Sequence, residues 1–308
     1  MSEEIENKLK KIPVVKQLVF LTKKVTLSSL QGLSLYDILE LYVLGIFKGA
    51  FSYRASAIAF SFFMALFPFA LFILNLIPYI PIENFQEDFL YFVEQGVPPT
   101  TFEAIQVILT DIMSNSYQSL LSSGFIISIF LMTNGTNAIL GGFEMSTHIT
   151  LSRGFIKQYL IALAISLALT ALLLITVAAI VVFEVFIQKI KLSGLITDDV
   201  YLIIWGRYIF VILMILISTS ILYKFGTRET KDVNFISYGA VFTTLLIILS
   251  SYLFGVYVEK FSRYNELYGS IGTLLVLMFY IWLNCMVLLL GFEINAAITK
   301  LKRKKLYI

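Results

Sequence analysis

Few side chains in this sequence could carry chemistry that needs a metal or a strong nucleophile. The 308 residues include one cysteine, Cys285, and one histidine, His148. No disulfide can form within the chain, and one subunit cannot supply two Cys or His ligands of the same kind to a metal. Motifs of P-loop NTPases, zinc proteases and serine hydrolases are absent. The sequence predicts no metal, no cofactor and no enzyme, although 20 Asp and Glu leave carboxylate chemistry open.

Polar side chains inside long apolar stretches are better candidates, because such groups are costly in lipid and need a reason to be there. One set has members successively seven residues apart: Arg54, Ser61, Pro68 and Asn75. Positions seven apart lie within about 20° of each other on a helix, so these residues form one stripe. Pro68 breaks a backbone hydrogen bond, and the freed carbonyl needs a partner inside the protein. We expect the stripe to face protein or water.

Two other apolar stretches carry amides and carboxylates on one helical face. The members are Asn134, Asn137 and Glu144 in one stretch, and Asn284, Glu293 and Asn295 in the other. Such faces line a cavity or transport path in some membrane proteins, and in others they join neighbouring helices. The spacing leaves both interpretations open.

Glu184 and Arg207 form a separate candidate. Each lies several residues inside an apolar stretch, and the loop between the two stretches is short enough to make them antiparallel neighbours. An isolated charge there costs about 2.5–3.5 kcal/mol on insertion scales, so we expect an intramembrane ion pair. The pair is either a structural lock or a gate or binding site for an anionic headgroup.

The elements that must position these residues are membrane-spanning helices. The chain is 58% hydrophobic and 14% charged, with a mean hydropathy of +0.87. About a quarter of the residues of a soluble domain are charged, so an ordinary soluble protein is excluded. Six apolar windows are long enough to cross a bilayer: residues 55–80, 121–143, 155–187, 200–223, 235–258 and 271–298. The predicted fold is an all-α, polytopic bundle of six transmembrane helices.

The distribution of Lys and Arg predicts the orientation. With six spans, 18 of these residues flank one side of the membrane and 4 the other, so both termini should be cytoplasmic. Residues 1–54 form a cytoplasmic segment with amphipathic helices on the leaflet surface, where anionic lipids are the expected partners. The transmembrane domain covers residues 55–298, and residues 299–308 form a basic tail. An acidic external segment, residues 81–120, is divided by prolines into two short helical stretches.

The first and last spans resemble a known family. The first contains an alanine-rich run from Arg54 to Pro68, and the last begins Tyr268-Gly-Ser-Ile-Gly272 and closes with Gly291-Phe-Glu-Ile-Asn295. Over roughly residues 40 to 300 the chain resembles the YihY and virulence factor BrkB family of bacterial inner-membrane proteins, once mislabelled as ribonuclease BN. The resemblance implies a six-span inner-membrane protein whose relatives have been linked to serum resistance and to lipid traffic.

Three functions are compatible with these features. The first is a non-enzymatic transporter or flippase-like protein for a lipid or an amphipathic or anionic solute, because polar faces and a proline occur within the spans. The second is a structural protein of the envelope, bound to a partner protein or to a second copy of itself. The third, an intramembrane enzyme, needs two carboxylates that converge on one cavity. Nucleic acid is not an expected partner, and the ribonuclease label finds no support in clustered carboxylates or a histidine pair.

Overall fold

The computed structural model describes residues 36, 50–76, 85–96, 102, 106–107, 109–110, 118–146, 148–192, 200–229, 234–261 and 270–306. The surface helices predicted within residues 1–54 lie outside this part of the chain, except for Tyr36, which is helical, and residues 50–54. Those five residues already belong to the first long helix.

The described residues form α-helices, and none of them lies in a β-strand. The helices are α4 (Ala50–Leu76), α5 (Phe85–Gly96), α7 (Gln118–Glu144), α8 (Phe155–Leu192), α9 (Val200–Gly226), α10 (Tyr238–Phe261) and α12 (Ser270–Leu306). Each of the six predicted apolar windows corresponds to one long helix. The short helix α5 is the first of the two predicted for the segment between the spans.

Five helices contain described segments long and apolar enough to cross a membrane: Phe125–Glu144, Phe155–Lys191, Tyr201–Gly226, Tyr238–Val258 and Leu274–Thr299. The described apolar part of α4, Phe51–Leu66, is shorter. The whole of α4 has 27 residues and is about 40 Å long at 1.5 Å per residue. The predicted all-α, polytopic membrane fold is therefore confirmed, with α4 as the sixth long helix.

The helix ends differ from the predicted windows for identifiable reasons. α10 begins at Tyr238 and not at residue 235, because the hydroxyl of Ser237 accepts a hydrogen bond from the backbone N–H of Ala240 at 3.2 Å and caps the helix. α12 continues to Leu306, so the basic residues predicted as a separate tail extend the helix. Hydropathy shows where the apolar stretch ends, but the hydrogen-bonded helix can continue beyond it.

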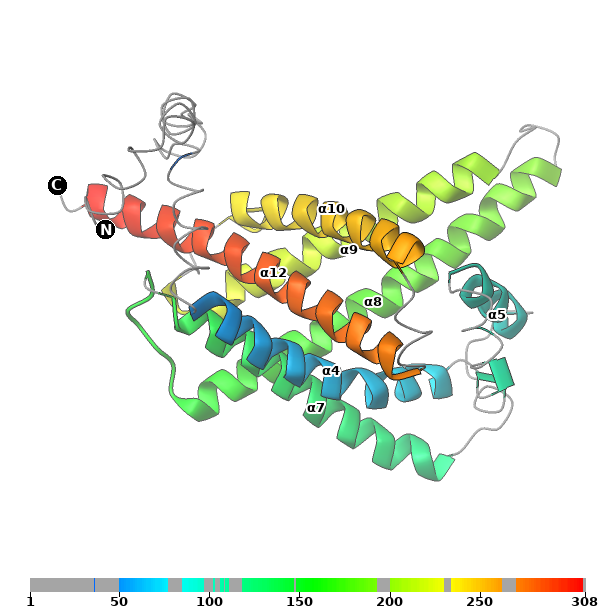
Figure 1. Ribbon diagram of the computed structural model, residues 1–308, viewed down its shortest axis with the longest axis horizontal. Coiled ribbons are helices and arrows are strands. Elements are labelled where there is room, and N and C mark those ends of the chain that lie inside the picture. Colours follow the sequence, from blue (N-terminus) through cyan, green and yellow to red (C-terminus); the bar gives the residue numbers. More distant parts are fainter. Residues whose placement is uncertain are drawn as a thin grey trace.

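The six long helices form a closed ring. Each packs against the next in the order α4, α7, α8, α9, α10 and α12, and α12 returns to α4. Consecutive helices run in opposite directions (Figure 1). α4, α8 and α10 begin, and α7, α9 and α12 end, at one end of the ring. We call it the basic end, because it carries these described residues: Arg153, Lys157, Lys224 and Arg228.

The best-packed part of the core lies at the basic end. The rings of Phe143 on α7 and Phe292 on α12 are stacked with centroids 4.1 Å apart, and the ring of Tyr223 on α9 contacts both. Leu140 and Leu289 are fully buried beside them. These five residues, which we call the apolar plug, pack together between α7, α9 and α12 at this end of the ring.

Pro68 lies inside α4, which continues past it to Leu76. The carbonyl of Pro68 accepts a hydrogen bond from the hydroxyl of Ser128 on α7 at 2.6 Å. The carbonyl that the missing N–H leaves free belongs to Met64, four residues earlier. Ser128 therefore supplies a polar partner next to the proline and joins α4 to α7 at that depth.

The outer surface of the ring is apolar. Large hydrophobic side chains such as Leu160, Ile175, Ile209, Leu245 and Leu253 are each more than half exposed. Exposed apolar area on this scale is unfavourable in water and favourable in lipid. The protein is therefore embedded in a membrane through the outer faces of these helices.

Candidate functional site

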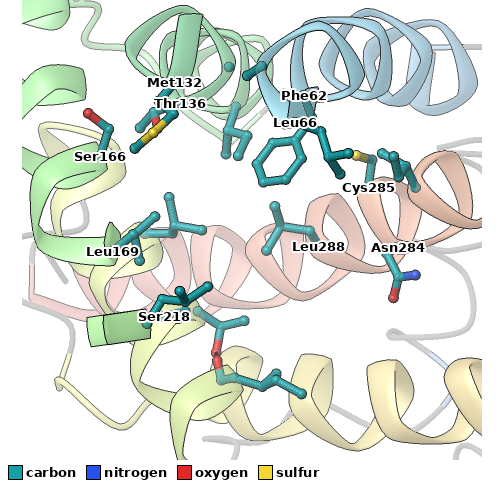
Figure 2. Close-up of a pocket in the computed structure, with 18 of the residues that line it drawn as sticks. Phe62, Leu66, Met132, Thr136, Ser166, Leu169, Ser218, Asn284, Cys285 and Leu288 are labelled. Atoms are coloured by element: carbon teal, nitrogen blue, oxygen red, sulfur yellow. Dashed lines mark hydrogen bonds between the residues drawn. The ribbon is translucent and has the colours of Figure 1, made fainter. Parts of the chain in front are cut away.

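A cavity of about 570 Å³ lies inside the ring, next to the apolar plug. All six long helices contribute to its wall (Figure 2). Along α7 the lining residues run from Met132 to Ile139 and precede plug residue Leu140, and along α12 they end at Leu288, just before plug residue Leu289. The plug therefore separates the cavity from the basic end. The volume is within the range of about 300–1,000 Å³ that is typical of ligand pockets.

The wall of the cavity is apolar in effect, although it contains hydroxyl groups. Thr170 and Thr219 each donate a hydrogen bond to a carbonyl of their own helix, and Ser166 donates to the carbonyl of Leu163 at 2.9 Å. A hydroxyl that bonds to its own helix no longer needs water or a ligand as a partner. Phe62, Leu66, Met132, Leu169 and Leu288 surround the open space in Figure 2.

Asn284 supplies an amide to this wall. Its Nδ2 donates to the carbonyl of Tyr280 at 2.9 Å, and its Oδ1 accepts a longer hydrogen bond of 3.4 Å from Ser250 on α10. The amide is thus already bonded to two helices. The described residues that line the cavity include no Asp, Glu, His, Lys or Arg.

A buried ion pair lies at the basic end of the ring. Arg54 on α4 donates from Nη1 to Oε1 of Glu293 on α12 at 3.1 Å, and the two side chains are only 3% and 7% exposed. Ser146, which follows α7, donates from its hydroxyl to Oε2 of Glu293 at 2.6 Å. The ring of Phe51 lies 5.1 Å from the guanidinium carbon of Arg54. The cluster joins α4, α7 and α12 where they meet.

The closest approach between α10 and α12 occurs at two glycines. A Cβ on Gly291 would lie 1.7 Å from Oγ1 of Thr243, and a Cβ on Gly239 would lie 2.2 Å from the carbonyl oxygen of Gly291. Asn295 bonds across the same contact: its Oδ1 accepts from the N–H of Gly239 at 2.9 Å, and its Nδ2 donates to Ser237 at 2.8 Å. Glycine lets the backbones meet, and the amide then satisfies the groups at the start of α10.

Tyr223 links three helices beside this contact. Its hydroxyl donates to the carbonyl of Leu288 on α12 at 2.7 Å and lies 2.6 Å from the hydroxyl of Thr243 on α10. The side chain of Tyr223 is 1% exposed. A buried hydroxyl with two partners fixes the position of α9 relative to α10 and α12.

The loop between α7 and α8 is held by two carboxylates. Oε1 of Glu229 accepts hydrogen bonds from the N–H groups of Thr150 and Leu151 and from the Thr150 hydroxyl at 2.7–2.8 Å. Glu144 accepts one from the N–H of Arg153, whose guanidinium donates to two carbonyls at the end of α9. Partial burial lowers the pKa of Arg153, and the nearby Glu144 opposes this shift. Arginine stays charged throughout.

Comparison with known proteins identifies the family. Residues 48–306, which include all six long helices and the cavity, match the family model described as virulence factor BrkB. The chain belongs to the virulence factor BrkB family. The resemblance inferred from the first and last spans is therefore confirmed.

Relatives of this BrkB-family chain include proteins from several bacteria. The putative ribonuclease-like protein YfkH of Bacillus subtilis is 32% identical over 255 residues, which cover 82% of this chain and 91% of the relative. A UPF0761 membrane protein of Coxiella burnetii is 22% identical over 254 residues, which cover 80% of this chain and 87% of the relative. No solved structure shows a significant match.

The polar residues predicted as candidates for a cavity or transport path lie in different places in the structure of this BrkB-family chain. Of those whose side chains are described, Asn284 lines the cavity, while Arg54 pairs with Glu293 at the basic end. The hydroxyl of Ser61 donates to the carbonyl of its own helix at Ala57, and this serine is absent from the cavity wall.

The remaining candidates lie elsewhere. Asn134 accepts a hydrogen bond from Tyr159 at 3.2 Å and joins α7 to α8. Asn137 is partly buried and does not line the cavity. The side chain of Asn75 lies outside the described part of the chain. The amides and carboxylates predicted on shared faces therefore mostly join helices to each other.

Glu184 and Arg207 lie on α8 and α9, far along both helices from the basic end. Nε of Arg207 donates to Oε1 of Glu184, and the two side chains are 27% and 22% exposed for Arg207 and Glu184, respectively. Phe183 packs against Gly206 and Phe210 next to the pair. The pair thus joins α8 to α9 near the ends of these helices that lie away from the basic end.

Several residues that build these sites were not predicted from the sequence. Tyr223 and Ser146 lie at the ends of spans, where an aromatic ring or a serine is an ordinary feature of a membrane interface. Glu229 is one of two acidic residues, with Asp232, among two basic ones in the loop between α9 and α10, so nothing in the sequence singled it out. The cavity wall is made by small or apolar side chains such as Ala65 and Ser218, which no polarity argument selects.

Proposed function

We propose that this protein is a non-enzymatic transporter of the bacterial inner membrane that carries a lipid or another amphipathic molecule. One observation carries the proposal: an apolar cavity of about 570 Å³ to whose wall all six long helices contribute. A hydrocarbon chain can enter this cavity without losing hydrogen bonds. An ion would exchange its hydrogen bonds with water for a wall that offers almost no hydrogen-bond partners. The cavity thus selects for the apolar part of the cargo.

The chemistry of the wall supports transport over catalysis. Its described residues include no His, Asp, Glu or Lys that could act as a general acid or base, and the hydroxyl of Tyr280 is already hydrogen-bonded to that of Ser251. No three His, Cys, Asp or Glu among the described residues come together in a way that could hold a metal. Hydrolysis of RNA, which the name of the Bacillus relative evokes, needs metal-binding carboxylates or paired histidines. The carboxylates of the basic end instead accept hydrogen bonds that join neighbouring segments of the chain.

The proposal also places the basic end in the cytoplasm, against anionic headgroups, following the distribution of Lys and Arg. In Escherichia coli, a fluorescent protein fused after α12 should then be fluorescent, and alkaline phosphatase at the same position should be inactive. Active phosphatase at that position would reverse the orientation.

Transport is tested with purified protein in liposomes that contain fluorescent phospholipids. Dithionite quenches the labelled lipids of the outer leaflet, so accelerated movement between leaflets appears as quenching of the inner pool. We expect the wild-type protein to accelerate this quenching relative to empty liposomes. Folded protein that moves no labelled lipid would refute the proposal and favour a structural function in the envelope.

The cavity is tested by filling it. Ala65 is 6% exposed and lines the wall, so Ala65→Phe places a benzyl ring in the space and should abolish the acceleration. Ala57→Phe is the matched control, because residue 57 lies two turns earlier on α4 with an exposed side chain. Ser218→Phe repeats the test from α9. Equal rates for Ala65→Phe and Ala57→Phe, with both proteins folded, would exclude the cavity as the path.

A further inference from the structure

The basic end holds a buried guanidinium that is only partly used. Arg54 is 4% exposed, and its Nη1 donates to Glu293. Its other two nitrogens, Nε and Nη2, have no hydrogen-bond partner in the part of the chain that the structure describes. The large majority of buried polar groups in native proteins have partners, and an unpaired one calls for an explanation such as strain, a bound water, an ion or a ligand.

The two unpaired nitrogens form one edge of the guanidinium. With this edge arginine binds carboxylates and phosphates through two parallel hydrogen bonds. Glu293 does not occupy the edge, because its Oε1 accepts from Nη1 of Arg54 at 3.1 Å and its Oε2 accepts from the hydroxyl of Ser146 at 2.6 Å. Ser146 thus holds the carboxylate where it partners Nη1 and leaves the edge uncovered.

The guanidinium is also held in a fixed orientation. The ring of Phe51 covers it, with 5.1 Å between the ring centroid and the guanidinium carbon, and Phe51 is itself 6% exposed. Glu293, 5% exposed, fixes the opposite nitrogen. A donor pair that is already oriented loses little entropy when an acceptor arrives. The basic residues at this end of the ring attract anions towards it.

The geometry points to an oxyanion site at the Nε–Nη2 edge of Arg54, which takes a phosphate group. A phosphate at a membrane surface comes from an anionic phospholipid headgroup or from free inorganic phosphate. The site does not line the cavity, so it goes beyond the proposed transport path. Because the two nitrogens are buried, the phosphate enters when the surrounding side chains move apart.

Three substitutions separate this site from a purely structural ion pair. Arg54→Gln removes both donors and should abolish phosphate binding. Arg54→Lys keeps the charge but not the edge, and should weaken binding at least about tenfold. Glu293→Gln keeps an oxygen for Nη1 and removes a negative charge close to the phosphate, so it should tighten binding about tenfold. A structural pair alone gives no reason for tighter binding in Glu293→Gln.

The experiment uses the full chain in maltoside micelles and phosphate-free buffer, studied by isothermal titration calorimetry. The probes are inorganic phosphate, phosphatidylglycerol and diacylglycerol, which has the same tails without the phosphate. Binding of inorganic phosphate supports a site for the free anion. Binding of phosphatidylglycerol, but of neither other probe, supports a lipid headgroup. In either case the three substitutions must change the affinity as stated.

Arg228→Gln is the matched control, because Arg228 is an exposed arginine at the same end of the ring: it removes one charge but no donor of the site, so it should weaken binding far less than Arg54→Lys does. The inference is overturned if neither phosphate probe binds, if Arg54→Gln binds as tightly as the wild type, or if Glu293→Gln weakens binding. Should Arg54→Gln fail to fold, Arg54→Lys and Glu293→Gln predict opposite changes and decide the question together.

Discussion

Gly291→Ala adds one methyl group at the closest contact between α10 and α12. The new carbon would lie 1.7 Å from Oγ1 of Thr243, 2.6 Å from the hydroxyl oxygen of Tyr223 and 2.9 Å from the carbonyl oxygen of Gly239. Ordinary contacts of a Cβ atom lie at 3.4–4 Å. The methyl group pushes α12 away from α10 and breaks the hydrogen bond between Tyr223 and Thr243.

The cost of this substitution follows from three terms. Overpacking a core costs about 1–3 kcal/mol, and a buried hydroxyl left without a partner costs about 1–3 kcal/mol. Alanine gains about 1 kcal/mol over glycine in a helix. We therefore expect Gly291→Ala to lower the free energy of unfolding by about 3 kcal/mol.

Unfolding of the purified protein in detergent, followed by tryptophan fluorescence during denaturant titration, measures this change. Gly255→Ala on α10 is the matched control: a Cβ there meets nothing within 4 Å, so stability should be unchanged or slightly higher. Thr243→Ala removes the nearest clash, and the double substitution with Gly291→Ala should lose less than the sum of the single losses. If Gly291→Ala is as stable as Gly255→Ala, the close contact is not part of the native packing.

Three further outcomes are expected from the polar contacts. Glu293→Ala leaves Arg54 buried without its carboxylate and should cost about 3–5 kcal/mol in the same assay, whereas Glu293→Leu combined with Arg54→Met should cost clearly less. Alanine substitutions of Glu184 and Arg207 should show a smaller coupling energy in a double-mutant cycle than those of Arg54 and Glu293, because this pair is partly exposed. Full additivity of the two substitutions would contradict direct pairing. Glu229→Ala removes the acceptor of three hydrogen bonds and should speed tryptic cleavage in the loop between α7 and α8; an unchanged cleavage rate would show that the carboxylate does not hold the loop.

The existence of the spans could be predicted because each depends on its own segment of sequence. An apolar run of about 20 residues in lipid must form a helix to satisfy its backbone. The start of α10 was missed by three residues, because a serine cap and not hydropathy determines it. The order of the helices around the ring could not be predicted, since hydropathy gives no information on which helix packs against which.

Helical spacing predicted which face a polar side chain occupies but not its partner. Arg54 was placed on a stripe that faces protein or water, and it pairs with Glu293, 239 residues away. Both residues were candidates, yet nothing in either segment relates one to the other. Ser61 shares the stripe with Arg54, but its hydroxyl donates to its own helix, which is a local alternative always open to serine.

The cavity was the least predictable feature, because it is defined by missing volume and not by residue type. An argument from polarity selects residues such as Asn295 and Glu293, and the structure shows that they form hydrogen bonds and an ion pair with neighbouring helices at the basic end. The cavity begins on the other side of the apolar plug, where small side chains such as Ala65 and Ser218 face the axis of the ring. In this fold the apolar plug and the polar clusters lie at one end of the ring, and the cavity on the other side of the plug is apolar. Under the proposed transport function, the cavity takes the hydrocarbon part of the cargo, and the phosphate site proposed at Arg54 lies apart from that path.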